Sequence, residues 1–574
     1  MHSLGKTNST SSSTAIAVPP STGLYHPPAD VEITQPRRHQ LAIIMGSLFF
    51  SLLLVSLDQS IVATVLPVIA SHFDALGEIE WVGTAYILPM TALQLLFGKL
   101  ADTFGRKRTL INAIIIFLVG SALSGAAQST LMLFIMRGVQ GIGAAGIAPL
   151  VMIIIGDIVP LRERGKYQSI VALCWATGSI AGPLVGGVLA DHLNWRWIFY
   201  INLPIGIISA LLLSLFLHIP RDKNDQTNQG LSWRAKCYNI DIPGAIVFIA
   251  SIFCFLLATQ WGGRWYPWKH PIILGLYAAS LVLVALVIVS SWWHLTSPNP
   301  ILPIHLFLDF NRVAIFAMVI ATSAAMFINV FYLPIYFQVA HGDTPTMAGF
   351  EVLPYLLPVD IVSMISGFIV SKTGYYRHMF WVGTALIAIG GGLQTLLDVD
   401  SNNATQIGFL ILTGAGVGFC IQNVYVAAQA STIQEEIASA ISLVCFFGYL
   451  GFVSGISIGG AIFNNTLAYY LRHRTALSEH QIREAQKSPE LLKRLEPGLR
   501  KSVAAAYGSS LQWTFLAVAI CGCLGFLFSL FLSSKKIQQD DTRQALSSSP
   551  LHRSSSSSSY DACSTTSTSS QSPT

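Results

Sequence analysis

The most constraining feature of this sequence is a long series of apolar segments, which follow one another through most of its 574 residues. Fourteen of these segments are long enough to cross the core of a bilayer, which takes about 20 helical residues. Backbone polar groups in lipid must be paired within the segment itself, so we expect each segment to be a helix. The segments lie at 41–69, 81–100, 109–127, 131–156, 167–190, 196–217, 241–260, 271–293, 311–338, 347–371, 379–397, 406–430, 437–463 and 513–532. The sequence therefore predicts an all-α polytopic membrane protein with 14 transmembrane helices.

The composition, and the motifs that are missing, argue against several other classes of protein. Charged residues are 11% of the chain, against about 25% in a soluble domain. The net charge of +5 comes from bases in short loops between apolar segments, so we expect no nucleic-acid partner. The sequence has no G-x-x-x-x-G-K-S/T phosphate loop, which argues against an ATP-driven pump. Its fourteen histidines lie in loops or near segment ends, so we expect no membrane-embedded enzyme or receptor, no metal site and no cofactor.

Basic residues predict the orientation of the segments. Loops after even-numbered segments are basic, whereas short loops after odd-numbered segments contain few lysines or arginines. Cytoplasmic loops are enriched in bases, so we expect both termini to be cytoplasmic. The segment 464–512 is then an external loop, and Ser488 to Glu490 is typical of a helix start within it. Asn403 and Asn464 begin Asn-x-Thr sequons on this external side, which makes both of them candidates for glycosylation.

Two glycine patterns occur twice, in the same order. One begins at Gly98 and again at Gly367, and the other begins at Gly178 and again at Gly451. The separations of 269 and 273 residues are nearly equal, which indicates two halves of the same architecture and orientation. We therefore expect a disordered cytoplasmic tail at 1–40, a six-helix half at 41–217, a linker with two extra helices at 218–310, a second six-helix half at 311–532 and a serine-rich disordered cytoplasmic tail at 533–574.

Five short segments carry a resemblance to a known family. The segment from Gly98 to Arg108 resembles the cytoplasmic signature of the major facilitator superfamily. The segments 57–67, 137–145, 178–187 and 194–204 are similar to motifs of its 14-span drug:proton antiporter branch. The resemblance covers essentially the whole apolar region, 41–532. It implies the major facilitator fold, with two six-helix halves and two inserted helices.

The resemblance also implies a gate in the loop after the second segment. The family places a charge relay there, between the two halves, and its positions match Gly98, Asp102, Gly105 and Arg106 in this sequence. Asp157, at the end of the fourth segment, is a further candidate for the relay. Glycines permit a tight turn, and Asp102 can pair with Arg106. The alternative is a basic anchor that only fixes the topology.

Three ionisable residues lie deep inside apolar segments, away from the segment ends, where a charge is costly unless it has a partner or a function. The resemblance makes Asp58 and Arg137 candidates for proton coupling, and Gln140 shares a helix face with Arg137. The alternative is a buried structural ion pair. Asp360 lies midway along the tenth segment. It either carries a proton, meets a cationic substrate, or is a protonated side chain that bonds to a neighbouring helix.

A set of glycines with one proline lies in the fifth segment and matches the antiporter motif of the branch. Four-residue spacing places the first glycines on one helix face and permits close contact with another helix. The resemblance implies a seal against proton leak, which is typical of exporters, whereas the alternative is ordinary tight packing. The residues concerned are Gly178, Gly182, Pro183, Gly186 and Gly187.

Polar residues in the central segments are candidates for a substrate cavity, although they could equally form hydrogen bonds between helices. They are Gln94, Gln140, Asn329, Tyr332, Gln422 and Asn423. We expect a proton-coupled exporter of small amphipathic compounds such as drugs, toxins or secreted secondary metabolites. The alternative is a proton-coupled importer or vacuolar permease for amino acids, siderophores or related solutes. The expected partners are membrane lipid, substrate and protons, in a plasma-membrane monomer, with the vacuolar membrane as the alternative location.

Overall fold

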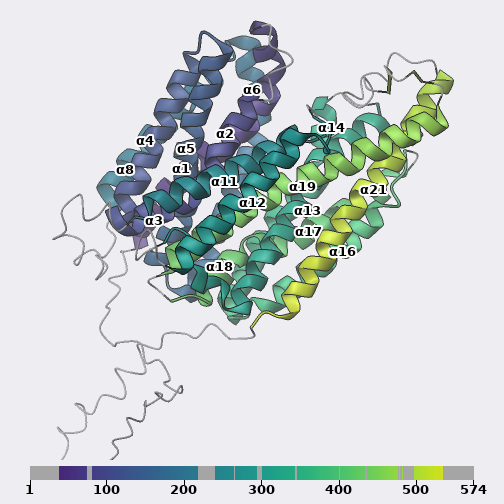
Figure 1. Ribbon diagram of the computed structural model, residues 1–574. Coiled ribbons are helices and arrows are strands. Elements are labelled where there is room, and N and C mark those ends of the chain that lie inside the picture. The colour runs from purple at the N-terminus through teal and green to yellow at the C-terminus, as the bar shows by residue number, and fades with distance from the viewer. Residues whose placement is uncertain are drawn as a thin grey trace, which may run out of the picture. The chain divides into compact units, whose positions relative to one another are not determined.

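The structure of the protein is a computed structural model, and it describes residues 38–73, 81–217, 240–263, 266–293, 300–342, 345–399, 401–433, 436–475, 477–478, 481–482 and 497–533. Within these ranges the chain forms helices and no β-strand (Figure 1). The elements are α1 (Arg38–His72), α2 (Trp81–Ala92), α3 (Gln94–Phe104), α4 (Arg106–Gly125), α5 (Thr130–Ile158), α6 (Leu161–His192), α7 (Trp197–Tyr200), α8 (Asn202–Phe216), α11 (Ile242–Trp261), α12 (Pro271–Trp292), η1 (Ile304–Phe307), α13 (Phe310–Ala340), α14 (Pro345–Glu351), α15 (Leu353–Thr373), α16 (Arg377–Gln394), α17 (Asn403–Ile421), α18 (Asn423–Ala430), α19 (Ile437–Arg474) and α21 (Pro497–Leu530). The predicted tails lie almost wholly outside the described residues, as does the predicted helix start at Ser488.

The all-α polytopic fold is confirmed, whereas the count of fourteen spans is not. Among the described residues, twelve helices are long and apolar enough to cross a membrane, and α2 with α3 makes a thirteenth span if the bent pair counts as one. The remaining predicted segment corresponds to α16, an 18-residue helix that packs against α17 and α21. Arg377, His378 and Gln394 lie within these 18 residues and lower the hydropathy of the helix.

Most of the helices pack into two groups, each with its own core. Figure 1 shows α1, α4, α5 and α8 in one group, and α13, α16, α17 and α21 in the other. Glycines bring helices of one group close together. If Gly120 of α4 carried a side chain, its Cβ would lie only 2.5 Å from the backbone nitrogen of Gln140 in α5, which is too close for any residue but glycine. A Cβ at Gly416 of α17 would likewise lie 2.7 Å from the carbonyl oxygen of Gly383 in α16. Backbones approach this closely only where side chains are small.

The inserted helices α11 and α12 pack mainly on each other. The Ser251 hydroxyl of α11 donates to the carbonyl of Ser280 in α12 at 3.2 Å. Asp241 caps α11 by accepting from the backbone N–H of Gly244 at 2.9 Å and also accepts from that of Ile301 at 3.3 Å. The carboxylate therefore ties the start of this pair to the chain that leads into α13.

Two spans are interrupted near their middles. Pro89 lies inside α2, and the chain bends by 48° between α2 and α3. Proline removes a backbone donor and favours such a kink. The span formed by α17 and α18 is interrupted at Gln422. The first break leaves Gln94 in the interior, and the second leaves Gln422 and Asn423 there.

The helices at the end of the chain extend further than the sequence indicates. The segment 464–512 is predicted as a loop, but α19 continues to Arg474 and α21 begins at Pro497. Asn464 consequently lies within α19 and not in a loop. The extensions are rich in charged and polar residues, so a hydropathy pattern ends the helices at the apolar boundary.

Candidate functional site

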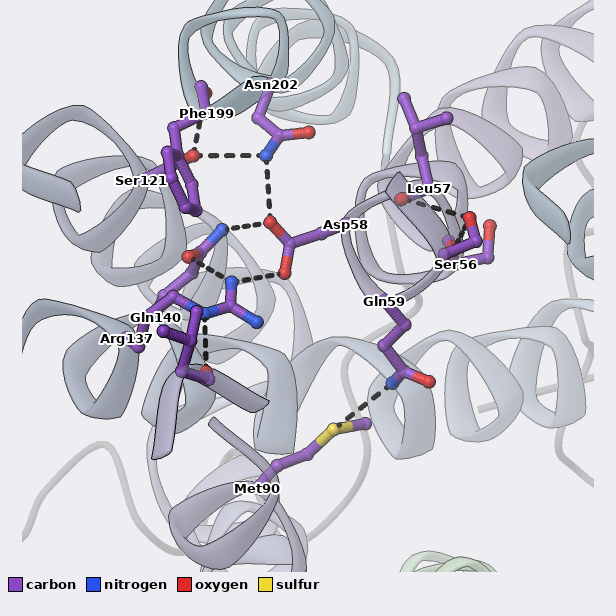
Figure 2. Close-up of polar contacts among 12 residues, drawn as sticks. Ser56, Leu57, Asp58, Gln59, Met90, Ser121, Arg137, Gln140, Phe199 and Asn202 are labelled. Atoms are coloured by element: carbon purple, nitrogen blue, oxygen red, sulfur yellow. Dashed lines mark hydrogen bonds and ion pairs between the residues drawn. The ribbon is translucent and has the colours of Figure 1, made fainter. Parts of the chain in front are cut away.

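The centre of the first group holds an ion pair that is closed to solvent. Arg137 of α5 donates from Nη1 to Oδ2 of Asp58 in α1 at 2.6 Å, and the two side chains are 2% and 0% exposed (Figure 2). The guanidinium also donates from Nε to the carbonyl of Val82 at 3.1 Å and from Nη1 to Oε1 of Gln140 at 2.7 Å. A buried pair is stable only when its remaining polar atoms are satisfied in this way.

The other oxygen of the Asp58 carboxylate has two amide partners. Oδ1 accepts from Nε2 of Gln140 at 2.7 Å and from Nδ2 of Asn202 at 3.2 Å. Asn202 begins α8, and its Nδ2 also donates to the hydroxyl of Ser121 in α4 at 3.1 Å. Ser121 in turn donates to the carbonyl of Phe199 at 2.8 Å. Figure 2 shows this chain of contacts leading away from the carboxylate.

Aromatic rings cover the guanidinium. The Cζ atom of Arg137 lies 4.3 Å from the centroid of the Tyr86 ring in α2 and 5.8 Å from that of Phe199. Gly141 of α5 makes the first contact possible, because a side chain there would collide with the backbone carbonyl of Tyr86. A cation over an aromatic face gains more when water is excluded, as it is here.

The predicted gate residues lie together at one end of the bundle, which we call the basic end because Arg106, Lys107, Arg164 and Arg377 lie there. Arg106 pairs from Nε with Oδ2 of Asp157 at 2.9 Å and from Nη2 with Oδ1 of Asp102 at 3.8 Å. Gly105 has a φ of 91°, a conformation that only glycine adopts easily, and it turns the chain from α3 into α4. The glycine thereby places Arg106 between the two carboxylates.

At the basic end, helices of the two groups touch. A Cβ at Gly98 of α3 would collide with the Ser442 hydroxyl of α19, and one at Gly165 of α6 would lie 2.5 Å from the carbonyl oxygen of Gly367 in α15. Two of the four residues at these contacts are glycines of the repeated pattern, Gly98 and Gly367. The glycines therefore allow the two groups to close on each other at this end.

A polar contact that the sequence did not indicate lies beside these glycines. Arg164 of α6 donates from Nη1 to Oε1 of Gln429 in α18 at 3.3 Å. Its other nitrogens donate to the carbonyls of Val159, at 3.0 Å, and of Gly156. From the sequence, Arg164 counts only as one of several loop bases, and nothing in the pattern relates it to a residue 265 positions later.

Asp360 lies in α15, apart from the Asp58–Arg137 pair. Its side chain is half-buried, and no hydrogen bond or ion pair to it is recorded among the described residues. Leu357 and Ile361, its neighbours on the helix surface, are 41% and 51% exposed. The carboxyl group is thus an isolated one within an apolar span, where ionisation is costly.

The antiporter-motif glycines face α1. Ser60 of α1 donates to the carbonyl of Gly178 at 2.7 Å, and a Cβ at Gly182 would lie 2.7 Å from the Cβ of Ser60. Gly186 is buried, whereas a Cβ at Gly187 would meet nothing within 4 Å. The side chain of Pro183 lies outside the described part of the structure. The first two glycines therefore set the distance between α6 and α1.

Three of the predicted cavity residues are held by bonds to other helices or to their own. Tyr332 donates to the carbonyl of Ile456 at 3.2 Å, and Asn423 donates to the hydroxyl of Ser366 at 3.1 Å. Asn329 donates back to the carbonyl of Ala325 at 3.3 Å. The contacts of Tyr332 and Asn423 match the interhelical alternative, whereas that of Asn329 lies within α13, and Gln140 belongs to the Asp58 network.

The remaining two cavity candidates have unpaired atoms, as do Asn329 and Asn423 at their Oδ1 oxygens. Both side-chain atoms of Gln94 are buried without a hydrogen-bond partner, as is Oε1 of Gln422. Each residue lies at the interruption of its span, beside the bend at Leu93 or between α17 and α18. Buried polar groups are normally paired, so these two positions have hydrogen-bonding capacity to spare.

The sequons differ in their surroundings. Asn403 is exposed at the start of α17, directly after the capping residue Asn402. Asn464 lies in the C-terminal third of α19 and is half-buried. A glycan is bulky and needs a free surface, so the surroundings of Asn403 suit it better.

Comparisons with known proteins agree on one family. The model of the Major Facilitator Superfamily matches residues 48–456. The chain is 36% identical over 503 residues to an MFS-type efflux pump of Arthroderma benhamiae, covering 87% of this chain and 92% of that protein. It is 34% identical over 517 residues to an MFS-type transporter of Diaporthe leptostromiformis (89% and 86% covered), and 32% identical over 504 residues to an efflux pump of Aspergillus parasiticus (87% and 97% covered).

Solved structures show the same fold at low sequence identity. The human organic anion transporter MFSD10 matches with a TM-score of 0.55 and 11% identity, over 86% of this chain and all (100%) of that one. The proton:xylose symporter XylE matches with a TM-score of 0.56 and 13% identity, over 88% of this chain and 99% of that one. These likenesses concern the arrangement of helices alone.

Proposed function

Because the chain belongs to the major facilitator superfamily of membrane transporters, we propose that it is a proton-coupled exporter of small amphipathic organic compounds. Two of the relatives named above are efflux pumps, which supports export over uptake. The fold needs no cofactor for such work. A proton gradient supplies about 1.4 kcal/mol per pH unit, and about 2.3 kcal/mol per 100 mV for each net charge moved.

The observation that carries the proton coupling is the Asp58–Arg137 pair. Its two charges balance while Asp58 is ionised, and protonation of Asp58 leaves the buried guanidinium without its counter-charge. A change of one proton therefore alters the stability of contacts among α1, α5 and α8 by several kcal/mol. A coupling site needs such a strong link between protonation and helix packing.

Asn202 positions the Asp58 carboxylate for this step. Its Nδ2 donates to the carboxylate, while its Oδ1 is buried without a hydrogen-bond partner. When Asp58 is protonated, rotation of the amide brings the free Oδ1 to the new O–H group. The same residue thus satisfies both protonation states, which lowers the barrier between them.

The basic end serves as the gate. Opening toward that side separates Arg164 from Gln429 and Gly98 from Ser442, while the pairs of Arg106 with Asp102 and Asp157 hold α3, α4 and α5 together. We assign this end to the cytoplasm, with both termini cytoplasmic. The protein would then act as a monomer in the plasma membrane and take up its substrate when the basic end opens.

Two further features complete the proposal. The close contact of Gly178 and Gly182 with Ser56 and Ser60 packs α6 tightly against one face of α1, and in this proposal it limits proton leak between the two helices. Asp360 provides a second carboxyl, in the other group of helices, that either takes up a proton or receives a cationic substrate. Its isolation favours a role in transport over a role in packing.

The proposal is tested by substrate efflux from right-side-out vesicles under an imposed proton gradient. Asp58→Asn should abolish gradient-driven efflux at normal expression, and Asp360→Asn should reduce it. Asp398→Asn is the matched control, because Asp398 is exposed in the loop before α17. Inward accumulation of substrate, or efflux that survives collapse of the gradient, would contradict the proposal and favour a permease.

A further inference from the structure

A cluster of polar and aromatic side chains lies between the two groups of helices, next to the Arg137 site. The amide of Gln59 in α1 lies beside the hydroxyls of Tyr86 in α2 and Tyr449 in α19. The hydroxyl of Tyr425 in α18 lies near that of Tyr449. We call Gln59, Tyr86, Tyr425 and Tyr449 the tyrosine cluster. Its members come from α1, α2, α18 and α19.

The polar atoms of this cluster have poor partners. The hydroxyl of Tyr86 is buried, in a residue that is only 1% exposed, and its polar neighbour, the amide of Gln59, makes no hydrogen bond of normal geometry to it. Gln59 donates from Nε2 to the thioether sulfur of Met90 at 3.5 Å (Figure 2), and the Tyr425 hydroxyl accepts from the thiol of Cys445 at 3.8 Å. Thioethers and thiols are weak hydrogen-bonding groups. Three strong polar groups therefore have unused capacity in one place.

Other tyrosine hydroxyls in this bundle are bonded to oxygen, although several buried amides, such as those of Gln94 and Gln394, have unpaired atoms. Tyr332 donates to a backbone carbonyl at 3.2 Å, Tyr336 does so at 2.8 Å, and Asn423 bonds to a serine hydroxyl at 3.1 Å. Since water is scarce inside a membrane bundle, an unpaired hydroxyl is a real cost there. Among the described residues, Tyr86 is the one tyrosine whose hydroxyl is buried without a hydrogen-bond partner, and it lies beside two further polar side chains with weak partners, which points to a ligand as the missing partner.

An aromatic surface continues from the cluster along α19. Phe452 lies one turn after Tyr449, with ring centroids 6.2 Å apart. The rings of Phe327 and Phe331 in α13 lie 4.0 Å and 6.5 Å from that of Phe452. Flat rings in such numbers favour stacking with a flat ligand.

The face of α19 that carries these rings also forms the closed contact at the basic end. Ser442, Cys445, Tyr449 and Phe452 follow one another at spacings of three and four residues, so they lie on one side of the helix. Ser442 meets Gly98 of α3, whereas Gln59, Tyr425, Tyr449 and the exposed Phe331 are partly open. The aromatic surface thus begins where the closed contact ends.

We propose that the tyrosine cluster, with Phe452 and Phe327, binds the transported molecule, and that this molecule is a neutral, planar aromatic compound carrying hydroxyl or carbonyl oxygens, of the phenol or quinone type. This inference rests on the proposed export function. The rings supply stacking, and Gln59, Tyr86 and Tyr425 supply donors and acceptors for the oxygens. No charged side chain belongs to the cluster, and Arg137 behind Tyr86 already donates to Asp58, Gln140 and Val82.

Binding is tested with full-length protein in lipid nanodiscs, without any gradient, by titration with alizarin, a dihydroxyanthraquinone. Tyr86→Phe, Tyr425→Phe and Gln59→Leu each remove one polar group and should weaken alizarin binding roughly tenfold. Anthracene, which has the same flat rings and no oxygen, should bind the parent and these variants equally. Phe452→Leu should weaken both probes.

Tyr277→Phe is the control, because the Tyr277 hydroxyl contacts Thr259 between the inserted helices at 3.2 Å. The Tyr277→Phe variant should bind alizarin with the same affinity as the parent. The inference fails if alizarin does not bind the parent, or if it binds all cluster variants with the parent's affinity. If the cluster variants weaken alizarin binding but the vesicles show no gradient-driven efflux, the proposed export function is wrong and this inference about binding stands. If alizarin efflux is driven by the gradient and is equal in the parent and the cluster variants, this inference is wrong and the export function stands.

Discussion

Arg137 and Asp58 are joined by a 2.6 Å contact in which neither side chain is more than 2% exposed. The pair connects the fold to the transport chemistry, because any change of charge on Asp58 acts directly on the packing of α1 against α5. The ring of Tyr86 lies 4.3 Å from the guanidinium of Arg137, and Tyr86 is also a member of the tyrosine cluster. The ion pair is therefore in contact with the proposed substrate-binding residues.

Neutralising one member of the pair should destabilise the protein as well as abolish transport. Asp58→Asn leaves Arg137 charged in the interior, so we expect a loss of about 3–5 kcal/mol in the free energy of unfolding. Asp58→Asn combined with Arg137→Gln should recover most of the thermal stability but none of the gradient-driven transport. Melting temperature and vesicle transport, measured on the same preparations, separate the two effects. A double variant that transports normally would remove the pair from the mechanism.

Asn202→Ala should slow gradient-driven transport at normal expression and normal thermal stability. The variant removes the amide whose Nδ2 donates to Asp58 and whose Oδ1 is the proposed acceptor for the protonated carboxyl, so both protonation states lose a partner. Vesicle transport and melting temperature, measured on the same preparations, separate this effect from a loss of folding. Asn402→Ala, at an exposed helix cap, should transport at the parent's rate. Transport by Asn202→Ala at the parent's rate would remove Asn202 from the mechanism.

Glycines of the antiporter motif should differ sharply in their tolerance of a methyl group. Gly182→Ala places a Cβ against Ser60, so we expect it to cost about 1–3 kcal/mol of stability and to increase proton leak. Gly187→Ala meets nothing within 4 Å and should be close to neutral. Thermal unfolding and passive proton flux into proteoliposomes measure both effects. Equal behaviour of the two variants would contradict the assigned α1–α6 seal.

Loss of the Arg164–Gln429 contact should open the basic end. Ser442→Cys, in a background without other reactive cysteines, reports on opening because Ser442 is fully buried against Gly98. Arg164→Ala or Gln429→Ala should raise its labelling by a thiol reagent several-fold, since each removes a bond that only the closed state makes. Arg312→Ala is the control, because Arg312 pairs within its own helix turn with Asp309. Labelling that stays slow in both variants would exclude Arg164 from the gate.

Much of the fold was predictable from the sequence, because spanning helices need long apolar segments. The ends of α19 and α21 were not predictable. Both helices continue into charged and polar residues beyond the apolar segment, and how far they continue depends on packing and capping, which a hydropathy pattern does not detect. The count of fourteen spans is not confirmed at α16, where polar residues at both ends lower the mean hydropathy of the helix.

The candidate site was predictable where a residue is costly in itself. Asp58 and Arg137 stand out because charge is expensive in lipid, and Gln140 follows from helical spacing. Asn202 lies 144 residues from Asp58, and an asparagine at a span entry gives no sign of its partner. Tyr86, Tyr425 and Tyr449 are aromatic residues among many in apolar segments. Only the structure shows that these three tyrosines lie close together and that the hydroxyl of Tyr86 has no hydrogen-bond partner.

The most direct test of proton-coupled export uses no imposed proton gradient. Proteoliposomes containing the purified protein and an internal pH dye receive an outward substrate gradient, and the direction of proton movement is recorded. The account predicts that downhill efflux of substrate drives protons inward, so that the interior acidifies, and that Asp58→Asn removes the signal. Alkalinisation of the interior would indicate symport, and substrate efflux without any pH change would contradict proton coupling altogether.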